Sequence, residues 1–293
     1  MRLILGTTPG SAPDVMARLF AHRMTEEGWG QIVVENKPGA SGNLAADFVA
    51  KSPPDGYTVM VCDSTIWAIN PHLFAHLAYD PLRDLTGVAA FADLPMYLTV
   101  NPSVPATDYE QFVSYARGHP GQLSYASAGN GSIHHITTEL YKSMTGLDLV
   151  HVPYKGMGPG AQALLAGEVQ VAFTSYAAVA PGVKAGKLRM LAVTTARRTP
   201  ALATLPTLQE MGLEGFDMSS LLGALAPAAT PRAVIDRLGA AMLAAAKSPE
   251  VAARMNELGV IPRFVASAPF NALREQEYEK YARLVKLSGA HMD

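Results

Sequence analysis

The feature that most constrains the fold of this chain is an alternation of a short β-rich run, a turn with Gly or Pro, and a helical stretch. Residues 2–6 predict a buried strand and residues 13–27 a helix, and the pattern returns with a strand at 31–35 and a helix at 42–51. Such alternation is typical of a mostly parallel sheet with helices on both faces. We therefore predict an α/β protein.

The alternation is interrupted twice, which predicts two lobes. Two prolines after residue 100 end the first series of strands and helices, and a second series follows. From residue 232 to the end the pattern is mostly helical. The length of 293 residues also exceeds what one core usually serves. We predict a first lobe from residues 1–100 plus 222–293, a second lobe inserted at 101–221, and a ligand cleft between them.

Charge and cysteine content exclude several classes of protein. The 23 Lys and Arg residues against 25 Asp and Glu residues give a net charge of −2. Without a basic surplus, nucleic-acid binding by phosphate neutralisation is excluded. The single Cys62 excludes an internal disulfide and a thiolate zinc site. The first apolar run is too short for a signal peptide or a membrane span, so we expect a cytosolic protein or an exported one shown without its leader.

Five separate segments carry a resemblance to a known family. They are residues 33–43, 54–58, 68–71, 125–132 and 150–156, which read VVENKPGASGN, PDGYT, AINP, YASAGNGS and VHVPYKG. In this order they resemble the Bug family, the extracytoplasmic solute receptors of tripartite tricarboxylate transporters. The resemblance extends over nearly the whole chain.

The resemblance implies a fold, a ligand and a partner. The fold would be a two-lobed periplasmic-binding-protein fold of the Venus flytrap, type II-like kind. The ligand would be a small carboxylate, either a di- or tricarboxylate or an aromatic acid, and the partner would be an inner-membrane tripartite tricarboxylate transporter. It also implies a monomer without cofactor, exported to the periplasm of a Gram-negative bacterium.

The turn at residues 6–14, between the first strand and the first helix, is a candidate anion site. Unpaired backbone N–H groups and the positive end of the helix dipole meet there, so no basic side chain is needed. The candidate residues are Thr7, Thr8, Gly10 and Ser11, with Asp14 expected to serve the helix dipole. The family turn usually has a Phe-Pro pair and paired glycines at Thr7-Thr8 and Gly10-Ser11, so a more polar wall is predicted.

The loop at residues 127–132 is the same device in the second lobe. Its candidate ligand-binding residues are Ser127, Gly129, Asn130, Gly131 and Ser132. Glycine allows a close approach of the backbone, and the polar side chains add hydrogen-bond donors. The loop lacks the Gly-Lys-Ser/Thr ending of a P-loop, so binding of a phosphate nucleotide is excluded. A plain turn is the alternative.

Three further segments at strand ends supply the remaining candidates. They are Ser64, Thr65 and Trp67, then Tyr154, Lys155 and Gly156, and finally Thr174 and Ser175. Trp67 is either a lid over the ligand or a core residue, and Lys155 is either a ligand contact or a surface lysine. Many family members have an acidic residue near Thr174, and its absence here argues against an amino-acid ligand.

The histidines do not predict a metal site. His134 is expected to face the pocket, while His135 and His151 are expected to be structural. Adjacent helical residues point about 100° apart, and no His-Glu-x-x-His run or cysteine cluster completes a site. No Gly-x-Ser-x-Gly elbow supplies a nucleophile, so no catalytic residue is predicted. Two alternatives stay open: an enzyme on the same fold, and a ligand sensor that uses the lobes without transport.

Overall fold

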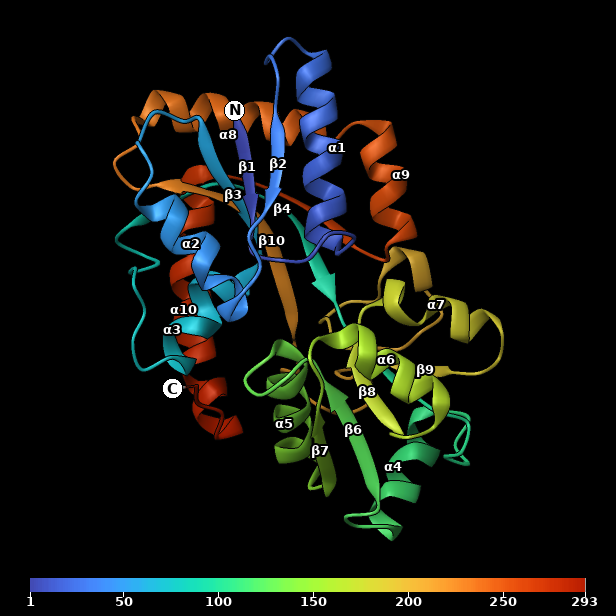
Figure 1. Cartoon of the computed structure of the whole chain (residues 1–293). Coiled ribbons are helices and arrows are strands. Elements are labelled where there is room, and N and C mark those ends of the chain that lie inside the picture. The colour runs from blue at the N-terminus through green and yellow to red at the C-terminus, as the bar shows by residue number, and fades with distance from the viewer. Residues whose placement is uncertain (293) are drawn as a thin grey trace.

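A computed structural model describes residues 1–292 and contains two β-sheets, one above the other in Figure 1. The first sheet has the strand order β11-β4-β10-β3-β1-β2, and the second has the order β7-β6-β8-β5-β9. The strands of the first are β1 (Arg2–Leu5), β2 (Val33–Asn36), β3 (Thr58–Cys62), β4 (Leu85–Pro95), β10 (Ser219–Pro227) and β11 (Ile261–Ala266). Those of the second are β5 (Tyr97–Val100), β6 (Leu123–Ser127), β7 (Leu149–Pro153), β8 (Val171–Thr174) and β9 (Arg189–Val193). We call each sheet with its helices a lobe.

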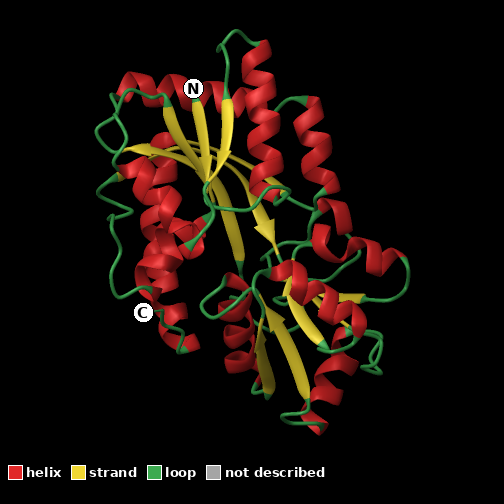
Figure 2. Cartoon of the chain, in the orientation of Figure 1, coloured by secondary structure: helices red, strands yellow, loops and turns green. Residues whose placement is uncertain are grey.

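Helices cover both faces of each sheet, as Figure 2 shows, and this confirms the α/β prediction. In the first lobe they are α1 (Ala12–Glu26), α2 (Asn43–Ala50), α3 (Asn70–Leu73), α8 (Arg232–Ala246), α9 (Pro249–Glu257) and α10 (Ser267–Ser288). In the second they are α4 (Tyr109–Gly118), α5 (Ile133–Thr145), α6 (Met157–Ala166) and α7 (Tyr176–Lys184). Short helical turns lie at Ala40–Gly42, Thr65–Ile69 and Pro200–Leu202.

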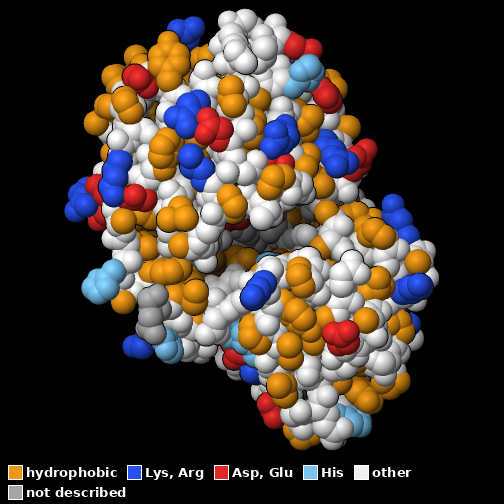
Figure 3. Space-filling view, in the orientation of Figure 1, with side chains coloured by type: hydrophobic (Ala, Val, Ile, Leu, Met, Phe, Trp, Pro, Cys, Tyr) orange, Lys and Arg blue, Asp and Glu red, His pale blue; other side chains and the backbone are white. Residues whose placement is uncertain are grey.

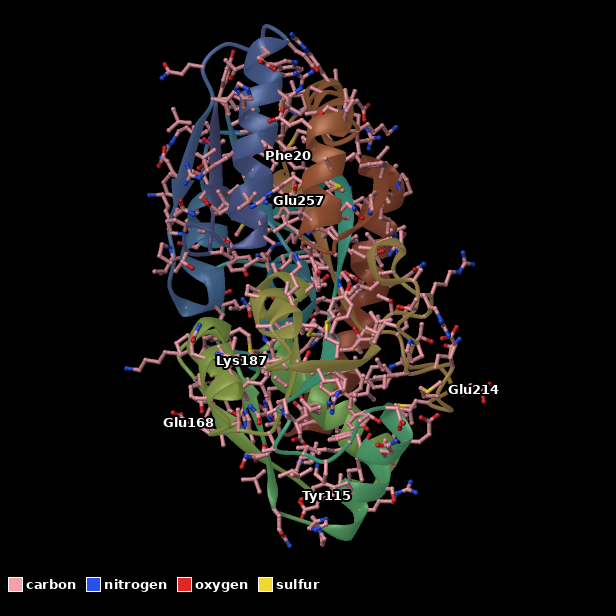
Figure 4. The ribbon with its side chains drawn as sticks, turned by 90° about the vertical axis from the view of Figure 1, so that its right-hand side faces the viewer. Phe20, Tyr115, Glu168, Lys187, Glu214 and Glu257 are labelled. Carbon is pink, nitrogen blue, oxygen red and sulfur yellow. The ribbon has the colours of Figure 1, made fainter. Side chains whose placement is uncertain are left out.

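The core of the first lobe follows from the alternation of side chains along β1. Leu3 and Leu5 face the helices α1 and α8, while Ile4 faces the opposite side of the sheet. On the first side, Phe20 of α1, labelled in Figure 4, packs against Phe91 with 4.7 Å between ring centroids. On the other side, α10 packs against β4 and continues to α5 of the second lobe.

Both sheets are mixed, which corrects the expectation of mostly parallel sheets. In the first sheet β1 is parallel to β2 and β3, whereas β10 is antiparallel to β3 and β4, and β11 is antiparallel to β4. In the second sheet β6 is parallel to β7 and β8, and β5 is antiparallel to β8 and β9. The antiparallel pairs arise largely because β4, β5 and β10 flank the points where the chain passes between the lobes.

Two segments connect the lobes. β4 ends at Pro95 and β5 begins at Tyr97, so the first crossing lies at Met96, and the return comes just before Ser219. The Thr194 N–H donates to the Met96 carbonyl (3.0 Å), and the Met218 N–H donates to the Thr194 carbonyl (2.8 Å). Residues 97–100, predicted in the first lobe, therefore pair in the second sheet. With the boundaries moved accordingly, the division into a discontinuous first lobe and an inserted second lobe stays a proposal.

One element contradicts the sequence-based prediction, and a second was not predicted. β11, within the stretch predicted to be mostly helical, pairs with β4 at the edge of the sheet. Its residues are mostly exposed and include Pro262, so the sequence lacks the alternation that marks a half-buried strand. The other element is the turn Thr65–Ile69, which has the wider winding of a π-helix.

Candidate functional site

A cavity of about 490 Å³ lies between the lobes, and its wall is built by both of them. Figure 3 shows the hollow between the upper and lower parts of the molecule. The predicted residues in this wall are Thr7, Thr8, Ser11 and Thr65 from the first lobe, and Gly131, Ser132, His134, Gly156 and Ser175 from the second. Residues from two separate series of strands and helices therefore meet at one site.

The turn between β1 and α1 forms one part of the wall. Ser11 is the N-cap residue of α1, and its hydroxyl donates to Thr7 Oγ1 (2.9 Å). Gly10 has a φ of +84° and lies outside the wall, because its N–H donates to Asp14 Oδ2 (2.9 Å). The Gly10 N–H is thus used within the turn, contrary to the prediction that it faces the ligand.

Asp14 holds this turn from behind. Its side chain is 2% exposed and accepts hydrogen bonds from Arg18 (2.9 and 3.1 Å) and Asn36 (2.9 Å). Burial raises the pKa of the Asp14 carboxyl, but the hydrogen bonds from Arg18, Gly10 and Asn36 outweigh it and leave this pKa below its ordinary value. Asp14 is therefore a paired carboxylate that supports the turn.

The loop between β6 and α5 forms the facing part of the wall. The Ser132 hydroxyl caps α5 by accepting from the His135 N–H (3.4 Å) and donates to the Gly129 carbonyl (2.7 Å). Ser127 is buried behind the wall, where its hydroxyl contacts His151 Nε2 (2.6 Å) and accepts from the Gly129 N–H (3.1 Å). These two hydroxyl groups shape the loop, and Asn130 lies outside the wall with its residue exposed.

Four helices begin at the cavity. Wall residues lie at or beside the N-terminal ends of α1 (Ser11), α5 (Ser132), α6 (Gly156) and α7 (Ser175). The first turn of a helix leaves backbone N–H groups without an intrahelical partner and carries the positive end of the helix dipole. Within residues 1–292 the wall contains no Lys or Arg, and its one charged residue is Asp63. The site can thus hold an anion through backbone groups.

The rest of the wall is neutral and largely apolar. Met60, Cys62, Ile66, Ile133 and Met157 contribute to it. Burial raises the pKa of the Cys62 thiol, so this group stays protonated. Burial also lowers the pKa of His134 to about 4, so its imidazole is neutral at pH 7.

The remaining predicted residues lie behind or beside the wall. Trp67 is fully buried, donates from Nε1 to Glu277 Oε2 (2.9 Å) and packs edge-on against Phe270. It is a core residue, and the lid alternative is wrong. Ser64 is also buried and donates to the same Glu277 oxygen (2.9 Å). Thr174 is fully buried, and neither Thr174 nor Gly129 lies in the wall.

The segment after β7 brings only its glycine to the wall. The Tyr154 N–H donates to the Ser127 carbonyl (3.0 Å), and the Gly156 N–H donates to the Tyr154 carbonyl (2.9 Å). Lys155 is exposed and outside the wall, which favours the surface-lysine alternative.

Several wall residues were missed in the sequence. Ser41 and Gly42 reach the wall because Gly6 approaches Gly42 so closely that a Cβ on Gly6 would lie 2.5 Å from the Gly42 Cα. Both belong to the segment 33–43 that carries the family resemblance, which was a usable signal. Asp63 directly follows β3 and could have been found from its place at the carboxyl end of that strand.

Comparison with known proteins identifies the family. A family model described as "Tripartite tricarboxylate transporter family receptor" (TctC) matches residues 16–289. The chain belongs to this family. Its structure is similar to that of R. palustris Rpa4515 with adipate, with a TM-score of 0.90 and 36% sequence identity over 100% of this chain and 98% of that one.

The chain is also similar to two further solved structures. The periplasmic binding protein BugD has a TM-score of 0.87 and 27% identity over 100% of this chain and 98% of that one. MatC from Rhodopseudomonas palustris with bound malate has a TM-score of 0.83 and 30% identity over 97% of this chain and 98% of that one. The resemblance to the Bug family and the periplasmic-binding-protein fold are thereby confirmed.

Membership also gives the general activity. The TctC/Bug family consists of periplasmic solute-binding receptors that work with transporter components, and two of its structures hold carboxylates. In the part of the chain that the structure describes, no helix is long and apolar enough to cross a membrane. Among those same residues, no three His, Cys, Asp or Glu side chains are grouped to hold a metal ion.

Proposed function

We propose that this chain is an extracytoplasmic receptor that captures a small carboxylate between its lobes and delivers it to a tripartite tricarboxylate transporter of the inner membrane. The observation that carries the proposal is the convergence of four helix N-termini on a cavity whose wall has no Lys or Arg within the described residues. Adipate in Rpa4515 and malate in MatC support a carboxylate as the ligand.

We propose as the ligand a carboxylate with two or three acid groups, or one with an aromatic ring. Backbone N–H groups at the helix ends suit the acid groups, while Met60, Ile66 and Met157 suit an alkyl or aryl body. A neutral His134 and a protonated Cys62 leave Asp63 as the charged side chain of the described wall.

Asp63 is the one charged side chain of the described wall, and its carboxylate serves the turn that follows β3. Its Oδ1 accepts the Thr65 N–H (2.9 Å), which occupies one of the two carboxylate oxygens. Malate and aspartate differ only in carrying a hydroxyl or an ammonium group at the same carbon. We expect malate to bind more tightly than aspartate, and titration calorimetry with the two ligands would contradict this part of the proposal if aspartate bound more tightly.

Closure of the two lobes couples the two halves of the site. Each lobe supplies helix ends, so a ligand that spans the cavity favours the conformation in which both sets reach it. The two crossing segments lie side by side through Thr194, which suits a hinge. Because one chain contains both walls of the cleft, we propose that the receptor works as a monomer in the periplasm.

The test is a thermal-shift screen against mono-, di- and tricarboxylates, followed by a search for turnover of any ligand that binds. A ligand at a hundredfold excess over its Kd should stabilise the protein by about 2.7 kcal/mol. Stabilisation by a carboxylate that is recovered unchanged is the expected result. Conversion of the ligand would favour an enzyme on this fold, and the absence of any stabilising carboxylate would overturn the proposal.

A further inference from the structure

The loop that faces the ligand in the second lobe is held by a histidine nitrogen. The Gly131 N–H donates to His135 Nδ1 over 3.1 Å, and Gly131 lies in the cavity wall. A backbone N–H can only donate, so Nδ1 must accept. His135 is therefore neutral in this structure, with its ring proton on Nε2.

His135 belongs to a stack of three rings from three different elements. Its ring lies parallel to that of His151 from β7, with 4.1 Å between centroids and 5° between planes. The other face of His151 stacks on Tyr125 from β6 at 4.8 Å and 13°. His151 also contacts the Ser127 hydroxyl, so the stack meets residues 127–132 at the first residue of the loop and again at Gly131.

The charged groups around the stack are already paired with each other. Glu139 and Lys142, on the same helix as His135, form a salt bridge of 2.8 Å, and Glu139 also accepts from the Tyr125 hydroxyl (2.7 Å). The titratable groups that face the two imidazoles are thus Glu139 and Lys142, and each imidazole also faces the other. Burial lowers the pKa of His135, and burial together with His135 lowers that of His151 to about 4.

We propose that His135 is a positioning residue of the ligand loop, and that its unprotonated Nδ1 sets the affinity of the cleft by fixing Gly131 in the wall. This inference rests on the proposed function, because it concerns the affinity for a carboxylate. Proton uptake at Nδ1 replaces the acceptor with a second donor that faces the Gly131 N–H. Two donors cannot share a hydrogen bond, so the loop must move.

Movement of Gly131 reaches beyond the loop itself. This residue has a φ of +69°, and a Cβ added to it would lie 2.5 Å from Leu73 Cδ2 in α3 of the first lobe. Gly131 is therefore at a contact between the lobes as well as in the wall. A loop released by protonation of His135 would disturb both the ligand contact and the contact with Leu73 of the first lobe.

Two substitutions distinguish the role of His135 as a hydrogen-bond acceptor from its role as a ring in the stack. His135→Asn keeps an acceptor near the position of Nδ1 but cannot take up a proton in this pH range. His135→Phe keeps an aromatic ring for the stack but has no acceptor. His22→Asn, at a largely exposed position on α1, is the matched control for loss of a histidine.

Titration calorimetry with adipate at about pH 7.5 and about pH 5.5 tests the proposal. Adipate takes up part of a proton at the lower pH in every variant alike, so the readout is the difference between the wild type and His135→Asn. Because burial lowers the pKa of His135, only part of the wild-type protein takes up a proton at the lower pH, so we expect the affinity of the wild type and of His22→Asn to fall about twofold further than that of His135→Asn. His135→Asn should lose only the affinity that protonation of adipate itself costs, and His135→Phe should be weak at both pH values. The same decrease in the wild type and in His135→Asn would overturn the proposal.

A measurement without ligand distinguishes this proposal from the proposed function. Nitrogen NMR of the wild-type protein should show His135 with its proton on Nε2 at neutral pH. The Gly131 amide should exchange faster as the ring takes up a proton, and should remain protected in His135→Asn. A proton on Nδ1 at neutral pH would overturn the positioning role even if adipate binds. Failure to bind any carboxylate would instead contradict the proposed function.

Discussion

The two turns that face each other across the cleft use the same backbone device on different supports. In the first lobe the turn between β1 and α1 is held by the Asp14 carboxylate, which is paired with Arg18 and Asn36. In the second lobe the loop between β6 and α5 is held by serine hydroxyls and by neutral His135 and His151. One wall therefore depends on a charged cluster and the other on uncharged groups.

Because of this difference, we expect the two walls to differ in their sensitivity to pH. The low pKa of Asp14 keeps its carboxylate paired over the whole range in which histidine changes its charge. The second wall contains the groups that proton uptake alters. A receptor of this construction would keep the first wall rigid while the second responds to conditions. Four substitutions or conditions can break or sharpen the comparison.

The largest effect is expected for Asp14→Ala. The change removes a buried carboxylate that accepts from Gly10, Arg18 and Asn36, and because Arg18 is half-exposed it should cost about 2–3 kcal/mol of the free energy of unfolding. Urea denaturation measures it. The control is Glu26→Ala on the same helix, whose exposed pair with Arg23 should matter little. Equal losses for the two variants would show that the charged cluster does not support the turn.

A smaller loss is expected for Ser127→Ala in the second wall. The variant removes the acceptor of the Gly129 N–H and the partner of His151, and hydroxyl groups in such positions contribute about 1–2 kcal/mol. The same denaturation experiment measures the effect. A loss as large as that of Asp14→Ala would remove the energetic difference between the two supports.

In an acid titration, the two walls should lose their contributions to stability in different pH ranges. His134 and His151 have pKa values near 4 in the folded protein, so below about pH 6.5 the unfolded chain binds protons that the folded one does not, and stability falls. The contribution of Asp14 is present above its unfolded pKa of about 4 and is lost only as the pH falls through its lower folded value. Denaturation of wild type and Asp14→Asn at several pH values measures this, and a gap that closes already near pH 6 would contradict it.

The smallest effect is expected for Lys155→Ala. Lys155 is exposed and lies outside the cavity wall, so carboxylate affinity should change by less than about twofold. Titration calorimetry measures the affinity, and low salt is the most stringent condition because exposed charges act most strongly there. A loss of tenfold or more would mean that a basic side chain contributes to a site we assign to backbone groups.

The sequence located the two turns that line the cavity because the signals for them are local. A strand followed by Gly, Ser or Thr and then a helix places backbone N–H groups at the strand end, and both turns were found in this way. What the individual side chains do was less predictable. Ser127 and Ser132 were expected to face the ligand, but their hydroxyls shape the loop, and that depends on neighbours such as His151 from another strand.

The direction of strands and the fate of Trp67 depend on contacts between distant parts of the chain. Nothing in β10 itself indicates that it enters the first sheet antiparallel to β3 and β4, because its direction follows from the return out of the second lobe. Trp67 follows a strand that ends at the cleft, yet Glu277, 210 residues later, accepts its N–H in the core. Local patterns carry no trace of such partners.

The most direct test of the central claim is calorimetric titration of the full chain with adipate and malate, with one glycine changed in each wall. In Gly6→Ala the new Cβ meets the Gly42 backbone, and in Gly131→Ala it meets Leu73, whereas Gly10→Ala places it in open space outside the wall. We predict one carboxylate per chain, with affinity lowered about tenfold or more by either wall variant and less by Gly10→Ala. Undiminished binding in both wall variants, or no binding of either acid by the wild type, would contradict the account.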